Sequence, residues 1–246
     1  MKKSWFTLEH TRQLTADTYE VVLSGDTSAI TAPGQFVNLE LPGKFLRRPI
    51  SICNWTEDGA LMLLVKVVGE GTRELVRCVP GTELDVLSCL GNGFDLSKTG
   101  AHPVLAGGGI GIAPLYGLAR RMLDTGVTTT VALGFRTAKD AFYLEEFAAL
   151  GCSLSVATED GSLGTRGFVT DCIRNVPECD YVLCCGPLPM LKAVHSLPGL
   201  TGGQFSFEAR MGCGFGACMG CTVPTVDGYK RVCKDGPILY KEEIVW

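Results

Sequence analysis

The sequence predicts an antiparallel β barrel followed by a doubly wound α/β domain with a parallel sheet, and a small cysteine-rich segment at the end. Three observations predict this order. Short alternating apolar runs fill about residues 18–91, buried strands followed by helices fill about 102–196, and four of the 12 cysteines gather after residue 210. A chain of 246 residues suits two ordinary domains of roughly 100 to 200 residues each.

The predicted barrel consists of runs whose apolar residues recur at the two-residue period of a strand. Turn pairs such as Asp58-Gly59 and Pro80-Gly81 separate these runs. Several short strands at this spacing are typical of a small antiparallel barrel, here interrupted by one short helix at 70–78. The expected strands cover residues 19–23, 37–41, 49–53, 61–68 and 83–87.

The second predicted domain alternates buried strands with amphipathic helices, which implies a parallel sheet covered by helices. The C-terminal segment starts with a strand-like run at 204–210 and is too small for its own apolar core, so a metal centre is expected to hold it together. The expected domains are residues 1–99, 100–203 and 204–246. The expected α/β elements are strands at 103–106, 128–135, 152–158 and 181–185, and helices at 113–123, 141–150, 168–174 and 189–195.

Charge and hydropathy exclude two classes of partner. The formal net charge is −4 and no block of like charges provides the basic face that nucleic acid requires. Lys2 and Lys3 are not followed by the apolar core of a signal peptide, so we expect a cytoplasmic protein. The longest uncharged run, at 103–119, is shorter than the ~20 apolar residues of a spanning helix, and no membrane association is expected.

The four C-terminal cysteines have the spacing Cys-x4-Cys-x2-Cys-x11-Cys, whose first three positions match the plant-type ferredoxin loop. Cytosolic thiols stay reduced, so metal binding explains them better than disulfides. Glycines between them allow the backbone to wrap closely around a bulky cluster. We therefore expect one 2Fe-2S cluster. A four-cysteine zinc site is the alternative, although zinc ribbons usually offer two separate Cys-x2-Cys pairs. The expected ligands are Cys213, Cys218, Cys221 and Cys233.

A flavin site is expected on the barrel. The run Arg48-Pro49-Ile50-Ser51 places a guanidinium beside a hydroxyl and exposed backbone, which can hold a pyrophosphate and present backbone to a flavin ring. A Gly turn that opens a short helix can receive the rest of the phosphate. The alternative is a surface basic pair before a core strand. The cofactor-binding candidates of the barrel are Arg48, Pro49, Ile50, Ser51, Val65, Lys66, Val67, Gly71 and Thr72.

A dinucleotide site is expected on the α/β domain. A Gly-rich turn follows the first buried strand and opens a helix, but Pro114 stands where the common fingerprint has Gly or Ala, which favours the ferredoxin-reductase variant. A tight turn without ligand is the alternative. Cys185 ends a later strand, where it could approach a nicotinamide or simply pack in the core. The candidates here are Gly107, Gly108, Gly109, Gly111, Pro114, Cys185, Gly186 and Pro187.

In this order, the flavin, dinucleotide and cysteine motifs resemble the electron-transfer subunits of bacterial NAD-dependent (type B) dihydroorotate dehydrogenases, within the ferredoxin-reductase superfamily. Ile50 replaces the Tyr that is usual in the superfamily's flavin motif. The resemblance implies one FAD and one 2Fe-2S cluster per subunit, with NAD as electron acceptor, in de novo pyrimidine (UMP) biosynthesis. It also implies an FMN-containing catalytic partner and a heterotetramer of two plus two subunits.

Dihydroorotate itself should be oxidised on that partner, because its TIM barrel of ~250 residues has no room in this chain. No catalytic side chain is therefore assigned here. Two rival readings remain: an NAD(P)H-ferredoxin or sulfhydrogenase-type reductase subunit, and a zinc or cluster sensor. The choice between NAD and NADP is also open, since Arg136 after the 128–135 strand could meet a 2′-phosphate or face solvent.

Overall fold

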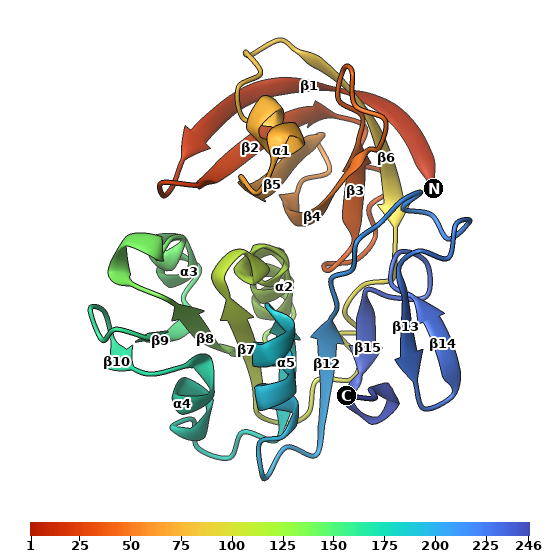
Figure 1. The fold of residues 1–246 in the computed structure, drawn as a ribbon. Helices are drawn as coiled ribbons and strands as arrows, with labels where there is room; N and C mark the ends of the chain where they lie inside the picture. Colours follow the sequence, from red (N-terminus) through yellow and green to blue (C-terminus); the bar gives the residue numbers. More distant parts are fainter.

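The structure, a computed structural model, describes all residues 1–246 and shows a β barrel packed on an α/β unit (Figure 1). The barrel is closed and antiparallel, as the sequence predicts, and its strand order is β1-β2-β5-β4-β3-β6. Its elements are β1 (Lys2–Gln13), β2 (Thr18–Gly25), β3 (Phe36–Leu39), β4 (Arg48–Trp55), β5 (Ala60–Lys66), α1 (Glu70–Leu75) and β6 (Glu83–Leu90).

The first strand, β1, is absent from the expected set. It is the longest strand of the chain, but only Phe6 and Leu8 of its residues are buried. Its register with β2 shifts between Leu8 and His10, which breaks the two-residue alternation that marks a strand in sequence. β1 nevertheless closes the barrel by pairing with both β2 and β6.

The second unit is a seven-stranded sheet of order β10-β9-β8-β7-β11-β12-β15. Its first six strands are parallel and β15 is antiparallel. α2 and α3 pack on one face, while α4 and α5 pack on the other, so the doubly wound prediction is confirmed. The elements are β7 (Pro103–Gly108), α2 (Ala113–Asp124), β8 (Thr130–Phe135), α3 (Leu144–Ala149), β9 (Ser153–Thr158), β10 (Thr165–Arg166), α4 (Val169–Arg174), β11 (Tyr181–Cys185) and α5 (Leu188–His195).

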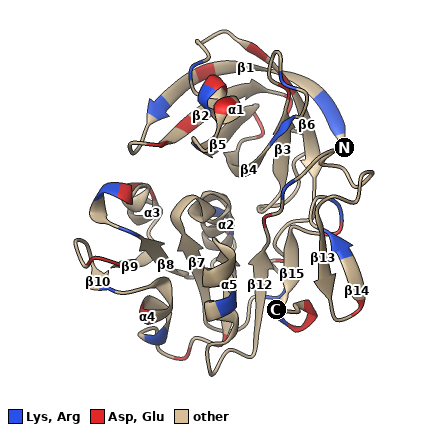
Figure 2. Cartoon of the chain, viewed as in Figure 1, with Lys and Arg blue, Asp and Glu red and all other residues tan.

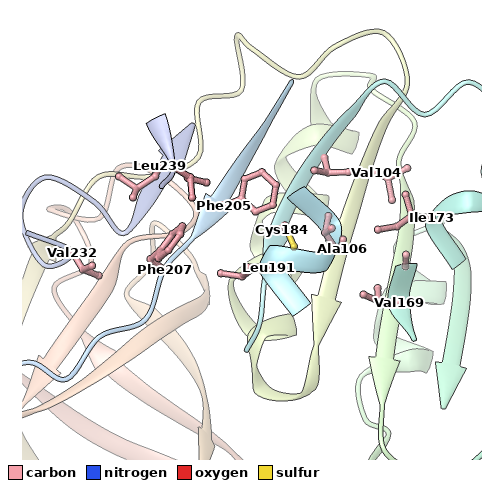
Figure 3. Packing of buried hydrophobic residues seen from close by; sticks show 14 of the residues in the cluster. Val104, Ala106, Val169, Ile173, Cys184, Leu191, Phe205, Phe207, Val232 and Leu239 are labelled. Carbon is pink, nitrogen blue, oxygen red and sulfur yellow. The ribbon is translucent and has the colours of Figure 1, made fainter. Parts of the chain in front are cut away.

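The C-terminal segment leaves the sheet and returns to it. β12 (Gly202–Ser206) pairs with β11, and β15 (Ile238–Tyr240) pairs back onto β12. Between them, β13 (Thr222–Thr225) and β14 (Gly228–Arg231) form a hairpin. The segment shares the core of the sheet, where Phe205 and Leu239 belong to the same cluster as Val104 and Leu191 (Figure 3).

The two units meet along α2, which packs against β4 of the barrel. Gly117 allows this close approach, because an added Cβ would lie 2.5 Å from the Cys53 carbonyl oxygen. The Arg121 guanidinium stacks on Trp55 at 3.3 Å from the ring centroid. This cation–π pair helps to fix the orientation of α2 relative to β4.

Charges of both signs are interspersed on the two units in the view of Figure 2. The formal net charge is −4. None of the helices has the length and apolar character needed to cross a membrane.

Candidate functional site

Two adjoining cavities lie between the barrel and the α/β unit. The larger has a volume of about 670 Å³ and the smaller about 330 Å³. Lys66, Ile110 and Glu208 line both cavities. The two spaces therefore meet at these three side chains, one from the barrel, one from the turn before α2 and one from the segment after β12.

The smaller cavity lies against the expected flavin motif on β4. Arg48 and Ser51 line it together with Pro49, Ile50 and Thr72. The Arg48 guanidinium passes directly over Gly71, where an added Cβ would lie 2.1 Å from Nε. Gly71 is thus required for the observed course of that side chain.

Thr72 gives the turn before α1 its shape. Its hydroxyl accepts hydrogen bonds from the backbone N–H groups of Val68 and Gly69, at 3.1 and 3.3 Å. These bonds hold the segment after β5 beside the smaller cavity, where Val68 and Thr72 both form part of the wall. Of the other candidates here, Val65 is fully buried in the barrel core and Val67 is half-buried.

The larger cavity lies over the carboxyl ends of the parallel strands, where doubly wound sheets bind their ligands. Gly108, Gly109 and Gly111 line it from the turn between β7 and α2. Gly186 and Pro187 line it from the turn after β11. The expected dinucleotide residues of two separate motifs are therefore brought to one cavity.

Glycine is needed at two points of this turn for different reasons. Gly109 has a φ of +54°, in the left-handed region that L side chains rarely adopt. At Gly111 an added Cβ would lie 2.4 Å from the Cys185 carbonyl oxygen. Gly107 and Pro114 lie behind the cavity wall, where both are buried. Their role is to pack the turn rather than to face the cavity.

Cys185 is 1% exposed in the core behind the larger cavity. Burial raises the pKa of its thiol to about 12, with the Glu208 carboxylate adding to the shift. The thiol is therefore neutral at physiological pH. Its expected approach to a nicotinamide stays a prediction.

Glu208 is a site residue that the sequence motifs miss. It stands two residues beyond β12 and faces the meeting point of the two cavities. Although the cavities leave it accessible, surrounding protein desolvates the carboxyl group and raises the pKa of Glu208. The only signal in the sequence is an acidic residue just after a buried strand, which by itself carries little information.

Charged pairs lie at the rim of the larger cavity. Lys66 contacts Asp17 at 3.4 Å on the barrel side, and Arg136 contacts Asp140 at 3.1 Å on the sheet side. Glu159 also lines the cavity. Arg136, whose side chain is 67% exposed, thus reaches the cavity already paired with a carboxylate.

The cysteine loop follows β12 and starts beside the smaller cavity, whose wall includes Met211. The Cys213 sulfur accepts hydrogen bonds from the backbone N–H groups of Ala217 and Cys218, at 3.2 and 3.4 Å. Burial acts to raise the pKa of Cys213, but backbone hydrogen bonds from Cys218, Phe215 and Ala217 outweigh it and lower the pKa to about 6. Such a thiol is readily deprotonated for metal binding.

Cys221 and Cys233 form a second, buried pair. The Cys233 N–H donates to the Cys221 sulfur at 3.4 Å. Burial, together with the neighbouring Cys221, raises the pKa of Cys233 to about 12, opposed by a hydrogen bond from the Gly216 backbone. Arg231, two residues before Cys233, donates a hydrogen bond to the Gly216 carbonyl at 3.0 Å. The loop that holds Cys213 therefore lies beside the segment that leads to Cys233.

The cysteine loop suits an iron-sulfur centre in its chemistry: four thiols as the donor set, backbone N–H groups aimed at sulfur, and glycines with positive φ at Gly214 and Gly216. The thiols lie as two neighbouring pairs, and no three side chains of His, Cys, Asp or Glu in the chain stand as a ready metal site. The four-ligand assignment stays a prediction.

Comparison with known proteins relates both halves of this site to one family. Residues 208–245 match the iron-sulfur cluster binding domain of dihydroorotate dehydrogenase B, and residues 105–196 match the oxidoreductase NAD-binding domain. The chain is 43% identical over 236 residues to a dihydroorotate dehydrogenase B (NAD(+)) electron transfer subunit from Listeria monocytogenes, covering 92% of each chain. It is 41% identical to the subunit of the same name from Geobacillus, covering 100% of this chain and 99% of that one.

Solved structures agree with the observed architecture. An NADH-dependent reduced ferredoxin-NADP oxidoreductase superposes with a TM-score of 0.89 at 30% identity, covering 98% of this chain and 90% of that one. An Amycolatopsis cytochrome P450 reductase gives 0.69 at 28% identity, covering 78% and 64%. With two domain matches in the expected order and relatives that are similar over nearly the whole length, the chain belongs to the family of dihydroorotate dehydrogenase B (NAD(+)) electron transfer subunits.

Proposed function

We propose that this chain carries electrons between NAD and a dihydroorotate dehydrogenase catalytic subunit, through FAD and a 2Fe-2S cluster. The observation that carries the proposal is the spatial order of the site. The larger cavity over the parallel strands meets the smaller cavity at Lys66, Ile110 and Glu208, and the smaller cavity extends to Met211 at the start of the cysteine loop. Three cofactor sites in contact form a relay.

In this proposal the smaller cavity holds the flavin of FAD. Arg48 pairs with the pyrophosphate, while Ser51 and the β4 backbone face the ring. Pro49, Ile50, Lys66 and Thr72 complete the wall. Gly71 makes room for the Arg48 guanidinium, and Val65 of β5 and Val67 directly after it support the wall from behind. When bound, FAD supplies the conversion between hydride exchange with nicotinamide and single-electron exchange with the cluster.

The larger cavity is assigned to NAD. Gly108, Gly109 and Gly111 form the face of the turn that receives the dinucleotide phosphates, with Gly107 and Pro114 packed behind it. Gly186 and Pro187 form the opposite wall, with Cys185 buried behind them. Lys66 and Glu208 occupy the point where nicotinamide and flavin must meet. The Asp140 and Glu159 carboxylates at the rim favour a ribose hydroxyl over a 2′-phosphate, which supports NAD over NADP.

The cysteine loop is assigned to the cluster, with Cys213, Cys218, Cys221 and Cys233 as ligands. We divide the chain accordingly into a FAD region at 1–99, a NAD region at 100–203 and a cluster region at 204–246. The division follows function rather than layers, because β12 spans the last boundary and β15 returns to the sheet. A reducing compartment suits four ligand thiols, which supports the cytoplasm as the location.

The partner is proposed to be the FMN-containing catalytic subunit, in an assembly of two catalytic and two electron-transfer subunits. The support is chemical: a cluster at the end of a relay must exchange electrons with a group outside this chain. Cys218 is exposed, and Phe215 and Met219 beside it are 43% and 53% exposed. The cluster loop therefore has a surface on which a partner can dock.

The test is to coexpress the chain with its catalytic subunit and purify the complex anaerobically. We expect FAD, iron and acid-labile sulfide in the ratio 1:2:2 per electron-transfer subunit, FMN on the partner, and reduction of NAD+ by dihydroorotate. Zinc without labile sulfide would contradict the cluster. A complex that contains all cofactors but transfers electrons from dihydroorotate to ferredoxin and not to NAD+ would contradict the assignment of NAD as electron acceptor.

A second candidate, a reductase subunit for ferredoxin, is favoured by one observation. The solved structure that superposes with a TM-score of 0.89 is an NADH-dependent reduced ferredoxin-NADP oxidoreductase. Its 30% identity is lower than the 43% of the Listeria relative. Identification of the protein that copurifies with the chain at its native expression level would distinguish the two functions.

A further inference from the structure

Asn38 on β3 stands between the smaller cavity and the cysteine loop. It is 1% exposed, and it pairs with Pro49 of the flavin motif on one side and with Leu87 of β6 on the other. Its Nδ2 donates a hydrogen bond to the Cys213 carbonyl at 3.2 Å. One side chain thus connects a flavin-side strand to the first cysteine.

The contact is close as well as polar. Gly214 lies directly over the amide, since an added Cβ there would be 2.3 Å from Nδ2. The φ of Gly214 is +78°, so the loop adopts a conformation that favours glycine at the point where it crosses Asn38. The loop is therefore seated on this amide rather than passing near it.

The amide is costly for stability. Asn38 Oδ1 is buried and has no hydrogen-bond partner. A buried polar atom without a partner is unfavourable, and an apolar group of the same shape would fill the space without that cost. The hydrogen bond that this amide does make is the one donated to the Cys213 carbonyl, which is the physical explanation for an amide at this place.

The same face of β3 also faces the flavin cavity. Phe36 lies two residues earlier, on the same side of the strand, and lines the smaller cavity. Phe36 also belongs to the core cluster that contains Cys221 and Cys233. One face of β3 thus lines the proposed flavin cavity at Phe36 and contacts the cysteine loop at Cys213 through Asn38.

We propose that Asn38 is a positioning residue that seats the cysteine loop on the flavin-side strand and thereby fixes the cluster at its working distance from the flavin. The inference rests on the proposed function. Asn38 touches neither cavity, so it acts through the loop. Electron transfer from flavin to cluster depends on this seat, while hydride transfer from NADH to flavin does not.

The test compares Asn38→Leu with Thr11→Val in the coexpressed complex. Thr11 Oγ1 on β1 is the other buried side-chain polar atom without a hydrogen-bond partner. Thr11→Val therefore also removes an unpaired buried polar atom, but on a strand away from the cysteine loop. For N38L we expect reduction of FAD by NADH at the parental rate and subsequent cluster reduction slowed about tenfold or more, as for the loss of one buried hydrogen bond. Both steps should be parental in T11V.

Hydrogen exchange of residues 211–220 gives a readout that needs no turnover. N38L should speed exchange of these amides about tenfold, with the melting temperature of the complex equal to or above that of the parent. Loss of iron from N38L while FAD is retained also supports the proposal, since the loop then lacks the hydrogen bond from Asn38 to Cys213. Parental cluster reduction and parental exchange in N38L overturn it.

Asn38→Asp covers the case in which N38L loses FAD as well as iron. Aspartate keeps the shape of asparagine but, when ionised, has no donor for the Cys213 carbonyl. The rate of cluster reduction is therefore measured at high pH, where the carboxyl group is ionised. A slower rate in N38D there supports the role of the hydrogen bond, and a parental rate there overturns it. A parent that never holds a cluster would instead refute the proposed function, which keeps the two failures distinct.

Discussion

The Tyr143 hydroxyl donates a hydrogen bond to the Glu20 carboxylate at 2.5 Å, and this contact joins the α/β unit to the barrel. Burial raises the pKa of Tyr143 well above its ordinary value, which keeps the hydroxyl protonated as a donor. Arg12 reinforces the joint by bonding to Glu20 at 3.0 Å and to Glu146 at 2.9 Å. The joint is a charged network across two folding units.

Tyr143→Phe should widen the larger cavity. Thr18 and Phe142, which are close in sequence to the two partners, both line it. We expect the KM for NADH to rise severalfold and stability to fall by about 1.5–3 kcal/mol, as for a hydrogen bond to a charged group. Steady-state kinetics and thermal unfolding check both. Tyr229→Phe, at a tyrosine 77% exposed, is the matched control and should change neither.

Arg48→Ala should weaken the binding of FAD. It removes the guanidinium proposed to pair with the pyrophosphate, a charged hydrogen bond of about 1.5–3 kcal/mol, so affinity should fall roughly ten- to a hundredfold. FAD released on gel filtration is the measurement. Retention equal to that of the parent would show that the site is assigned wrongly.

Two neighbouring variants sharpen this test. Gly71→Ala keeps the charge of Arg48 but places a methyl group 2.1 Å from its Nε, so it should also release FAD. Arg47→Ala removes an equal charge that pairs with Glu40 and Asp85 instead of facing the cavity. It should retain FAD and lower only stability.

Cys218→Ser should separate two activities of the complex. Reduction of a small dye at the flavin by NADH should survive, because it lies upstream of the cluster. Electron flow from dihydroorotate to NAD+ should fall by orders of magnitude, since it must cross the cluster. Dihydroorotate reduction of a dye at the FMN proposed for the catalytic partner should persist.

The control is Cys179→Ser, a cysteine outside the four expected ligands, which should leave every activity unchanged. Because metal binding is often coupled to folding, gel filtration must first show an intact complex that contains FAD. Near-parental turnover from dihydroorotate to NAD+ in such a complex, with the cluster confirmed absent, would refute the relay.

Glu208→Gln should alter the dependence of stability on pH. Burial raises the pKa of Glu208 from 4.5 in the folded state, so ionisation opposes folding. Below pH 4.5 both states bind the proton and no penalty exists. As pH rises through 4.5 to the raised folded pKa, the parent loses stability that the glutamine variant retains. Denaturant unfolding of both proteins at several pH values gives their free energies of unfolding. The difference in favour of the variant should grow between pH 4.5 and the raised folded pKa and stay constant above it.

The sequence predicts the fold here because its signals are local. Alternation places most barrel strands within two or three residues, and the Gly-rich turn before α2 is correctly placed between a buried strand and a helix. β1 is missed because its bulge interrupts the alternation. β15 is missed because three residues, Ile238 to Tyr240, carry no period of their own and pair only through β12.

The site is predicted less completely because its decisive contacts join distant residues. The sequence indicates Arg48 and Gly71 as candidates, but not that one passes over the other. Glu208 and Asn38 belong to no motif, and both become informative only when the fold places them beside the cavities and the cysteine loop. Their contacts depend on strand register, which no short sequence pattern encodes.

The return of β15 to β12 also has a consequence for cluster assembly. The pairing of Ser206 with Ile238 ties the two ends of the cysteine segment to the sheet. The strand pairing thus offsets the entropic cost of closing this loop, independently of metal binding. The thiols are held at a high effective concentration on an already folded support. We accordingly expect the proposed cluster to assemble on the folded sheet, without refolding of the nucleotide-binding units.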